Sequence, residues 1–186
     1  MVFLNKTVRS QLPQDMIEEV AARTEGWLAG LQLLGLSLQG HADLGDLLEE
    51  VSGRQRYIFD YLIEEVFQNQ SASVQTFLLY TSILSRLSAP LCDAILEQSG
   101  SQQVLEQLER ANLFIVSLDT QRRWYRYHAL FTEALRHRLE QTQPTLVPIL
   151  HYRTSQWYAQ HGRLNEAISY AITAQQWQWA ADLGEQ

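Results

Sequence analysis

The sequence predicts a mainly α-helical chain that contains one short β-hairpin. Apolar residues recur at the helical period through most of the chain. Only residues 113–118 and 124–128 combine aromatic and β-branched side chains with strand-like alternation, and a turn-forming stretch separates them. With 186 residues, 46% of them hydrophobic and 19% charged, the chain is large enough to bury a core.

Helical periodicity begins near the N-terminus and predicts helices over residues 15–23, 26–38, 43–51 and 55–69. In the second of these helices Trp27 and Leu31 share one apolar stripe, while Gly26 and Gly30 allow another backbone to approach closely. The sequence therefore predicts a packed, nearly buried helix at this point.

Three shorter helices follow, over residues 71–84, 88–98 and 101–112. Each begins at a serine, Ser71, Ser88 or Ser101, whose hydroxyl is a favourable N-cap. The hairpin comes next, and residues 129–140 continue as a helix. Three helices followed by a hairpin are the order of parts in a winged-helix domain, so we expect that fold here.

The pattern changes after Pro144 and Pro148 to helices over residues 150–161, 165–174 and from 176 onward. Large residues before Gly162 are followed by small ones at Ala167 and Ala171, and small residues let two helices nest. This spacing is similar to a tetratricopeptide-type helical hairpin. One repeat and part of a second predict the start of a longer solenoid.

The charge of the chain argues against a surface built to hold phosphates throughout. Acidic residues number 21 and basic residues 14, which gives a net charge of -7. Lys6 is the only lysine and has no glycine before it, so the chain lacks a G-x-x-x-x-G-K-[ST] phosphate-binding loop. This segment is therefore not itself the nucleotide-hydrolysing core of a P-loop protein.

Cysteine use and hydropathy favour a cytoplasmic location. Cys92 is the only cysteine, so it has no internal disulfide partner. The longest apolar stretch, residues 27–38, is interrupted by polar residues and is too short for a membrane span. The N-terminus shows no secretory pattern, and we expect the sequence to be part of a longer protein.

Catalytic motifs are weak throughout the sequence. It contains no H-E-x-x-H, no G-x-S-x-G and no G-x-G-x-x-G after a strand, and its five histidines lack metal-ligand spacing. Neighbouring carboxylates such as Glu49 and Glu50 point about 100° apart on a helix and do not converge on a substrate. We therefore expect no metal site and no catalytic activity of the segment by itself.

The most unusual chemistry lies in RRWYRYH at 122–128, where alternation would place Trp124, Arg126 and His128 on one face. A cation and an imidazole could then face an anion together. The structural alternative is arginine stacked on tryptophan beside a histidine bonded to a backbone carbonyl. A third interpretation is a wing that contacts DNA phosphates, but the preceding helix has Glu106 and Glu109 against a single Arg110.

Several motifs occur together in the order of one known family. They are RTEGWLAGLQL at 23–33, DYLIEEV at 60–66, FLLYTSIL at 77–84, ANLF at 111–114 and WYRYHALF at 124–131. In these motifs the chain resembles the MalT-like, LuxR-type ATP-dependent transcriptional regulators, which belong to the signal-transducing (STAND) NTPases. The resemblance covers nearly the whole chain.

The resemblance implies a helical arm over residues 1–69, a winged-helix domain over 70–142 and the start of a tetratricopeptide-like sensor over 143–186. Such a segment would lie between an upstream NTPase domain and a downstream DNA-binding helix-turn-helix. It would couple the nucleotide state of the NTPase domain to the sensor and to the DNA-binding domain. Domains of the same chain would be its partners, DNA would be bound only by the terminal domain, and the full-length protein could form a ligand-driven oligomer.

The same resemblance implies residues that complete a nucleotide site. Gly26, Trp27 and Leu28 are similar to the family's G-x-P motif, and Leu28 replaces the proline that lies against adenine. His128 is similar to the winged-helix histidine that reaches the β-phosphate of ADP, with Arg126 beside it in sequence. ATP or ADP would then be bound by the full-length protein, which would hydrolyse ATP slowly, and we expect no nucleotide on this segment alone.

Two other functions stay open at this point. A winged-helix DNA binder would use Arg122, Arg123 and Arg126 on phosphates and would show salt-dependent binding to duplex DNA. A plain helical scaffold for protein interactions would show no dependence on nucleotide.

Overall fold

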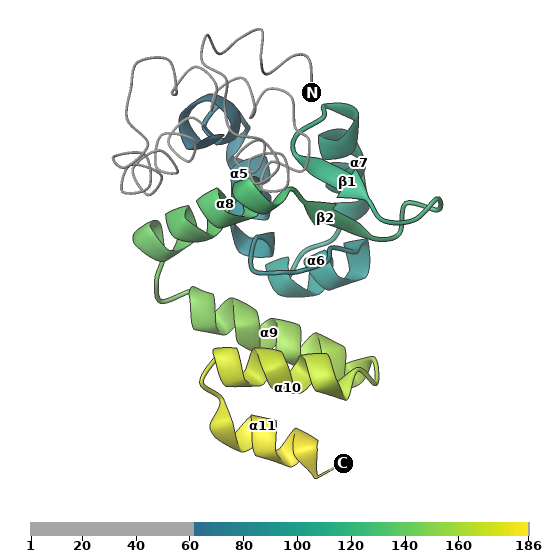
Figure 1. Ribbon diagram of the computed structural model, residues 1–186, viewed down its shortest axis with the longest axis vertical. Coiled ribbons are helices and arrows are strands. Elements are labelled where there is room, and N and C mark those ends of the chain that lie inside the picture. Colours follow the sequence, from purple (N-terminus) through teal and green to yellow (C-terminus); the bar gives the residue numbers. More distant parts are fainter. Residues whose placement is uncertain (1–61, 186) are drawn as a thin grey trace, which may run out of the picture. The chain divides into compact units, whose positions relative to one another are not determined.

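The computed structural model describes residues 62–185 (Figure 1). The chain divides into two compact units. The first includes the described residues 62–69 and 128–134, and the second comprises Gln70–Tyr127 and Leu135–Gln186. The helices predicted over 15–23, 26–38 and 43–51 lie outside the described residues.

The described part of the first unit consists of a π-helical turn and the beginning of a long helix. The turn, η1, spans Leu62–Phe67 and buries Leu62, Ile63 and Phe67. It falls within the segment predicted as a helix over 55–69, but its hydrogen-bond pattern is wider than that of an α-helix. The helix α8, Ala129–Thr142, contributes Leu130, Phe131 and Ala134 as buried side chains of this unit.

The second unit begins with three short helices, α5 (Ala72–Thr81), α6 (Ala89–Leu96) and α7 (Ser101–Arg110). Each is shorter than the predicted helix. They bury a common apolar core, whose fully enclosed members include Phe77, Leu78, Leu91, Ile95, Leu105 and Leu108. The positions of these side chains follow the helical period that predicted the elements.

The serines that begin these helices differ in what they do. The Ser71 hydroxyl accepts a hydrogen bond from the Val74 N–H and caps α5 as predicted. Ser88 occupies the N-cap position of α6 without a side-chain bond. The prediction that Ser101 caps α7 is wrong: Gly100 is the cap residue at φ 102°, and the Ser101 N–H donates to the Asp93 carboxylate at 2.9 Å. The Asp93 carboxylate of α6 therefore accepts the hydrogen bond of the Ser101 backbone N–H, which the hydroxyl of a capping serine would not reach.

The predicted hairpin is present and is shorter than its sequence pattern. Strand β1 (Ile115–Ser117) pairs antiparallel with β2 (Tyr125–Tyr127), with Ile115 opposite Tyr127. Leu87 exchanges two backbone hydrogen bonds with Tyr125, at 2.8 and 2.9 Å, and so joins the segment before α6 to the sheet. In Figure 1 the turn of the hairpin extends away from α6 and α7.

Three helices follow α8 in the described residues: α9 (Val147–Gln160), α10 (Leu164–Thr173) and α11 (Trp177–Gly184). They lie one beside the next in chain order, with α10 packed against both neighbours (Figure 1). Helix α9 begins three residues before the predicted start at Leu150, because Pro148 falls in its first turn, where a proline costs no hydrogen bond.

The turn between α9 and α10 has a defined chemistry. Gly162 adopts φ 69°, its N–H donates to the Ala159 carbonyl at 3.1 Å, and the Arg163 N–H donates to the Tyr158 carbonyl at 2.9 Å. This is a Schellman ending, in which glycine supplies the left-handed residue that closes a helix. The two helices then meet through buried Ala167 and Ala171, so the predicted nesting on small residues is confirmed.

Hydrogen bonds join the helical hairpin to the three-helix core within the second unit. Arg153 of α9 donates to the Ile95 carbonyl at 3.0 Å and pairs with Glu97 at 2.5 Å. The Tyr80 hydroxyl, near the end of α5, donates at 3.0 Å to Gln143 in the connection that leads from α8 into α9. These contacts hold the two groups of helices in one compact unit.

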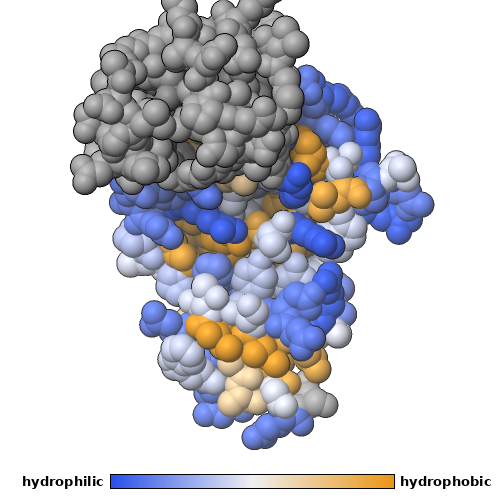
Figure 2. Space-filling view, viewed as in Figure 1, coloured by the Kyte–Doolittle hydropathy of each residue, from blue (hydrophilic) through white to orange (hydrophobic). Residues whose placement is uncertain are grey.

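The surface of the second unit is uneven in polarity. Figure 2 shows hydrophilic residues around the hairpin turn and a hydrophobic band at the level of α10. The exposed apolar side chains include Ile149, Ile172 and Trp177. Across residues 62–185, every helix is too short or too polar to pass through a bilayer.

Candidate functional site

The strand β2 carries the centre of the aromatic and basic cluster noted in the sequence. Tyr125 and Tyr127 point inward and are buried, while Arg126 between them is half-buried, as strand alternation predicted. The Tyr127 hydroxyl lies 2.8 Å from the Thr81 hydroxyl, and burial raises the pKa of this phenol. The inward face of β2 is therefore structural, and Arg126 is its outward side chain.

His128 follows β2 and precedes the first turn of α8. Its backbone carbonyl accepts hydrogen bonds from the Thr132 N–H at 2.9 Å and from the Thr132 hydroxyl at 3.1 Å. The residue is half-buried. Arg126 and His128 belong to different compact units, and Gly26 and Leu28 lie outside the described residues. The four predicted nucleotide contacts thus remain a prediction.

The hairpin turn is held by one carboxylate. Asp119 accepts hydrogen bonds from the backbone N–H groups of Gln121, Arg123 and Trp124, at 2.8, 3.2 and 2.8 Å. Desolvation acts to raise the pKa of Asp119, but the three N–H donors outweigh it, so the pKa is lowered. The carboxylate is an integral part of the turn.

The basic residues near the hairpin are partly engaged with the acidic helix beside it. Arg122 forms an ion pair with Glu109 of α7 at 3.2 Å, and Arg110 pairs with Glu106 at 2.9 Å. An arginine that faces a carboxylate of its own chain is less available to a DNA phosphate. These pairs weaken the DNA-binding interpretation of the wing.

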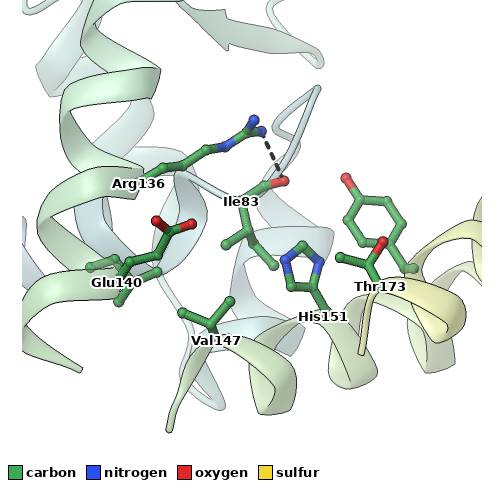
Figure 3. A pocket seen from close by; sticks show the side chains of 8 residues that line it. Ile83, Arg136, Glu140, Val147, His151 and Thr173 are labelled. Atoms are coloured by element: carbon green, nitrogen blue, oxygen red, sulfur yellow. Dashed lines mark hydrogen bonds between the residues drawn. The ribbon is translucent and has the colours of Figure 1, made fainter. Parts of the chain in front are cut away.

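A second candidate site is a hollow of about 330 Å³ in the second unit, which the sequence did not predict (Figure 3). It lies where the α5–α6 connection, α8, α9 and α10 meet. Its lining residues are Ile83, Arg136, Leu139, Glu140, Val147, His151, Tyr170 and Thr173. Three of these side chains are aliphatic, and two carry opposite charges.

The position of Arg136 in this hollow is fixed by backbone carbonyls. Its Nε donates to the Ser82 carbonyl at 2.8 Å and one terminal nitrogen donates to the Ile83 carbonyl at 3.1 Å. Ser82 is the C-cap residue of α5, so the guanidinium also faces the negative end of that helix. Figure 3 shows the bond to Ile83 and the Arg136 side chain reaching across the top of the hollow.

His151 forms another wall of the hollow and is neutral at pH 7. Burial, and then the nearby Arg136 guanidinium, lower the pKa of its imidazole to about 4. Its Nδ1 is buried without a hydrogen-bond partner, and its ring lies 5.6 Å from the Tyr170 ring. In Figure 3 one ring nitrogen faces Arg136 and Glu140, and the other faces Thr173.

Among the residues that the structure describes, histidine, cysteine and carboxylate side chains form no group of three or more able to hold a metal ion. In the sequence, His151 has no metal-ligand spacing and no other pattern that marks it as part of a site. The one local signal for the hollow was the four-residue spacing of Arg136 and Glu140 on a predicted helix.

Helices around a small antiparallel hairpin, followed by a helical pair, define a winged-helix domain with an attached helical region. Residues 63–147 match the family described as MalT winged helix domain. Over these residues the chain is similar to the MalT winged helix domain. The resemblance to MalT-like proteins in the motifs at 77–84, 111–114 and 124–131 is thereby confirmed.

The match to individual relatives extends beyond the domain. The chain is 33% identical to the serine/threonine-protein kinase PknK of Mycobacterium tuberculosis over 99% of its own length and 17% of the relative. It is 29% identical to the HTH-type transcriptional regulator MalT of Vibrio parahaemolyticus over 91% of its length, and 30% identical to that of Yersinia pestis over 92%. It spans 19% of either regulator, so the chain corresponds to less than a fifth of each relative.

Proposed function

We propose that the chain is a non-catalytic regulatory segment of a LuxR-family, ATP-dependent transcriptional regulator. In this role it couples the nucleotide state of an upstream NTPase domain to a downstream sensor and DNA-binding domain. A kinase and a transcriptional regulator both contain a segment similar to the chain. What such proteins share is better explained by a common regulatory module than by either named activity.

The observation that carries the proposal is the Arg153 contact between the helical hairpin and the winged-helix core. The guanidinium binds the last turn of α6 through the Ile95 carbonyl and Glu97. A displacement of α6 is therefore transmitted to α9 by a charged hydrogen bond rather than by a flexible linker. Such a link suits a segment that passes a conformational signal along one chain.

His128 is the proposed contact with the diphosphate. It is half-buried, so part of the residue is open to a ligand, and it directly precedes the first turn of α8. The N–H groups of a first helical turn favour a phosphate, and an imidazole can donate to one. This arrangement fits ADP, whose phosphates would supply the negative charge. Arg126, Gly26 and Leu28 are proposed to complete the site only when the upstream domain is present.

The remaining parts of the proposal concern the whole protein. Residues 1–69 are proposed as a helical arm, 70–142 as the winged-helix domain and 143–186 as the start of a tetratricopeptide-like sensor. The partners are other domains of the same chain in the cytoplasm, and DNA is bound through a terminal helix-turn-helix. Oligomerisation driven by an inducer belongs to the same proposal.

The test uses His128→Ala in the full-length protein. We expect faster ADP release and higher basal transcription, because a contact of a charged hydrogen-bonding group is lost, and one such contact shifts a two-state equilibrium by about tenfold or more. His137→Ala, at an exposed position of α8, is the matched control. An unchanged ADP off-rate together with unchanged reporter output would overturn the role of His128.

The DNA-binding alternative is tested on the chain itself. If the wing reads phosphates, the chain binds duplex DNA with an affinity that falls steeply as salt increases. The Arg122 to Glu109 ion pair favours the opposite result, almost no binding. A scaffold without regulation would instead show no response to nucleotide in the full-length protein.

A further inference from the structure

The hollow between α8, α9 and α10 contains two opposite charges that do not satisfy each other. Arg136 and Glu140 lie one turn apart on α8, a spacing at which such residues often form an ion pair. Within the described part of the chain neither forms one, because the guanidinium is bound to the carbonyls of Ser82 and Ile83. An arginine that precedes a glutamate by four residues is also the weaker orientation for a helical pair. Both charges therefore line the hollow separately (Figure 3).

The hydrogen-bond capacity of Arg136 is only partly used. A guanidinium carries five N–H donors, and carbonyls take two of them here. The remaining donors are held in place by those two bonds, so a carboxylate could bind them without first ordering the side chain. The fixed cation is a preformed anchor.

The rest of the lining is apolar or neutral. Ile83 and Leu139 are buried in the wall of the hollow, and Val147 is the partly exposed aliphatic residue of the lining. His151 adds no charge near neutral pH because burial and Arg136 lower its pKa to about 4. The volume of about 330 Å³ is at the lower end of the range for small-molecule sites. The lining combines one anchor for a carboxylate, one acceptor for an ammonium group and an apolar wall.

We propose that this hollow binds a small zwitterion, namely an α-amino acid with an aliphatic side chain. Its carboxylate binds Arg136, its ammonium group binds Glu140, and its side chain packs on Val147 at the aliphatic wall. A simple anion would be repelled by Glu140 and a simple cation by Arg136, so only a ligand with both charges satisfies both residues. The hollow contains none of the residues proposed to contact nucleotide.

Binding would also stabilise the second unit. The lining comes from the α5–α6 connection and α8 on one side and from α9 and α10 on the other. A ligand that contacts both groups favours the state in which they are joined, and mass action raises the unfolding midpoint as ligand is added. The hollow would thus make the contact between the winged-helix core and the hairpin responsive to a metabolite.

The first experiment is calorimetric titration of the chain with L-leucine, leucinamide and 4-methylpentanoate. Leucinamide lacks the carboxylate and 4-methylpentanoate lacks the amine, so we expect each to bind about tenfold more weakly or worse than L-leucine. The proposal is overturned if L-leucine shows no saturable binding at about 10 mM, an affinity too weak to be specific. It is also overturned if all three ligands bind equally.

The second experiment separates recognition from folding. Glu140 is exposed, so Glu140→Gln should leave the fold intact. We expect it to lower the affinity for L-leucine about tenfold while 4-methylpentanoate binds equally or better, because the repulsion of its carboxylate is removed. Glu185→Gln, at an exposed position after α11, is the charge-matched control and should change neither affinity. Equal losses for both ligands in Glu140→Gln, or a loss in the control, would refute the assignment.

Discussion

The hydroxyl of Ser155 joins three helices of the second unit, and its removal gives a quantitative test of how they are held. The residue is fully buried on α9. Its Oγ donates to the Ala167 carbonyl of α10 at 2.7 Å and accepts a hydrogen bond from the Trp179 indole N–H of α11 at 2.9 Å. Ser155→Ala deletes both bonds with almost no change in volume.

The expected cost comes mainly from the indole. Without the hydroxyl, the partly buried Trp179 N–H has lost its acceptor, and an unsatisfied donor of this kind costs about 1–3 kcal/mol. We expect a loss of about 2 kcal/mol in the free energy of unfolding, which corresponds to a fall in Tm of about 4–8 °C for a chain of this size. Urea and thermal unfolding followed by circular dichroism measure both quantities. Ser169→Ala, at an exposed position of α10, is the control and should cost less than about 0.5 kcal/mol.

A double-mutant cycle tests the reasoning itself. Trp179→Phe removes the N–H, so Ser155→Ala should cost less in that background than in the wild type. A coupling energy of about 1 kcal/mol is expected. If Ser155→Ala costs the same in both backgrounds, the hydroxyl-to-indole bond contributes nothing and the reasoning fails.

Three further predictions concern single side chains. Arg153→Met should lower the free energy of unfolding by about 1–2 kcal/mol, because the hydrogen bond to the Ile95 carbonyl is lost. Glu97→Gln should lower it by less than about 0.5 kcal/mol, because the Glu97 carboxylate is largely exposed. Equal losses for the two variants in urea unfolding would contradict this prediction. The folded-state pKa of His151 is about 4 against an ordinary 6.5, so the folded state binds fewer protons between these values, and stability should be full above pH 6.5 and decline toward pH 4. Because His151 is only partly buried, the free energy of unfolding should fall by about 1–2 kcal/mol over this pH range. In urea titrations at a series of pH values, His151→Gln should remove this dependence on pH. Because the pKa of Asp119 is lowered in the folded chain, its carboxylate stabilises the hairpin turn fully above the ordinary pKa of 3.8, and this stabilisation is lost as pH falls through the lower folded pKa. Asp119→Asn should speed hydrogen exchange of the Trp124 amide. Unchanged exchange would show that the carboxylate does not hold the turn.

Local patterns predicted most of the described fold because local chemistry determines it. Alternation in β2 predicted that Arg126 lies on a different face from Tyr125 and Tyr127, and the two tyrosines are buried while Arg126 is half-buried. The Ser71 cap was visible because its partner is three residues away. The predicted start of α9 at residue 150 is wrong by three residues, because the prediction began the helix after Pro148, whereas a proline is favourable in a first helical turn. The Ser101 prediction failed because the actual partner of its N–H, Asp93, belongs to another helix.

In the candidate sites, too, features set by neighbouring residues could be predicted, and features set by residues distant in sequence could not. His128 and Arg126 were selected through family resemblance, which points to residues without giving their surroundings. The hollow was not predicted, because Arg136 meets Ser82 and Ile83 only in the folded chain, 54 and 53 residues away in sequence. His151 was not predicted either, because its lowered pKa comes from burial and from Arg136, which meets it only in the folded chain.

Because Arg136 is bonded to the end of α5, the residues that line the hollow are not equally free to be substituted. A substitution at 136 would remove the cation from the hollow and would also release the carbonyls of Ser82 and Ile83 that close a core helix. Glu140 and Thr173 are exposed and carry no comparable structural duty toward α5. Selection or engineering could therefore change the preferred ligand through positions 140 and 173, while the anchor for a negative group is inherited together with the stability of the fold.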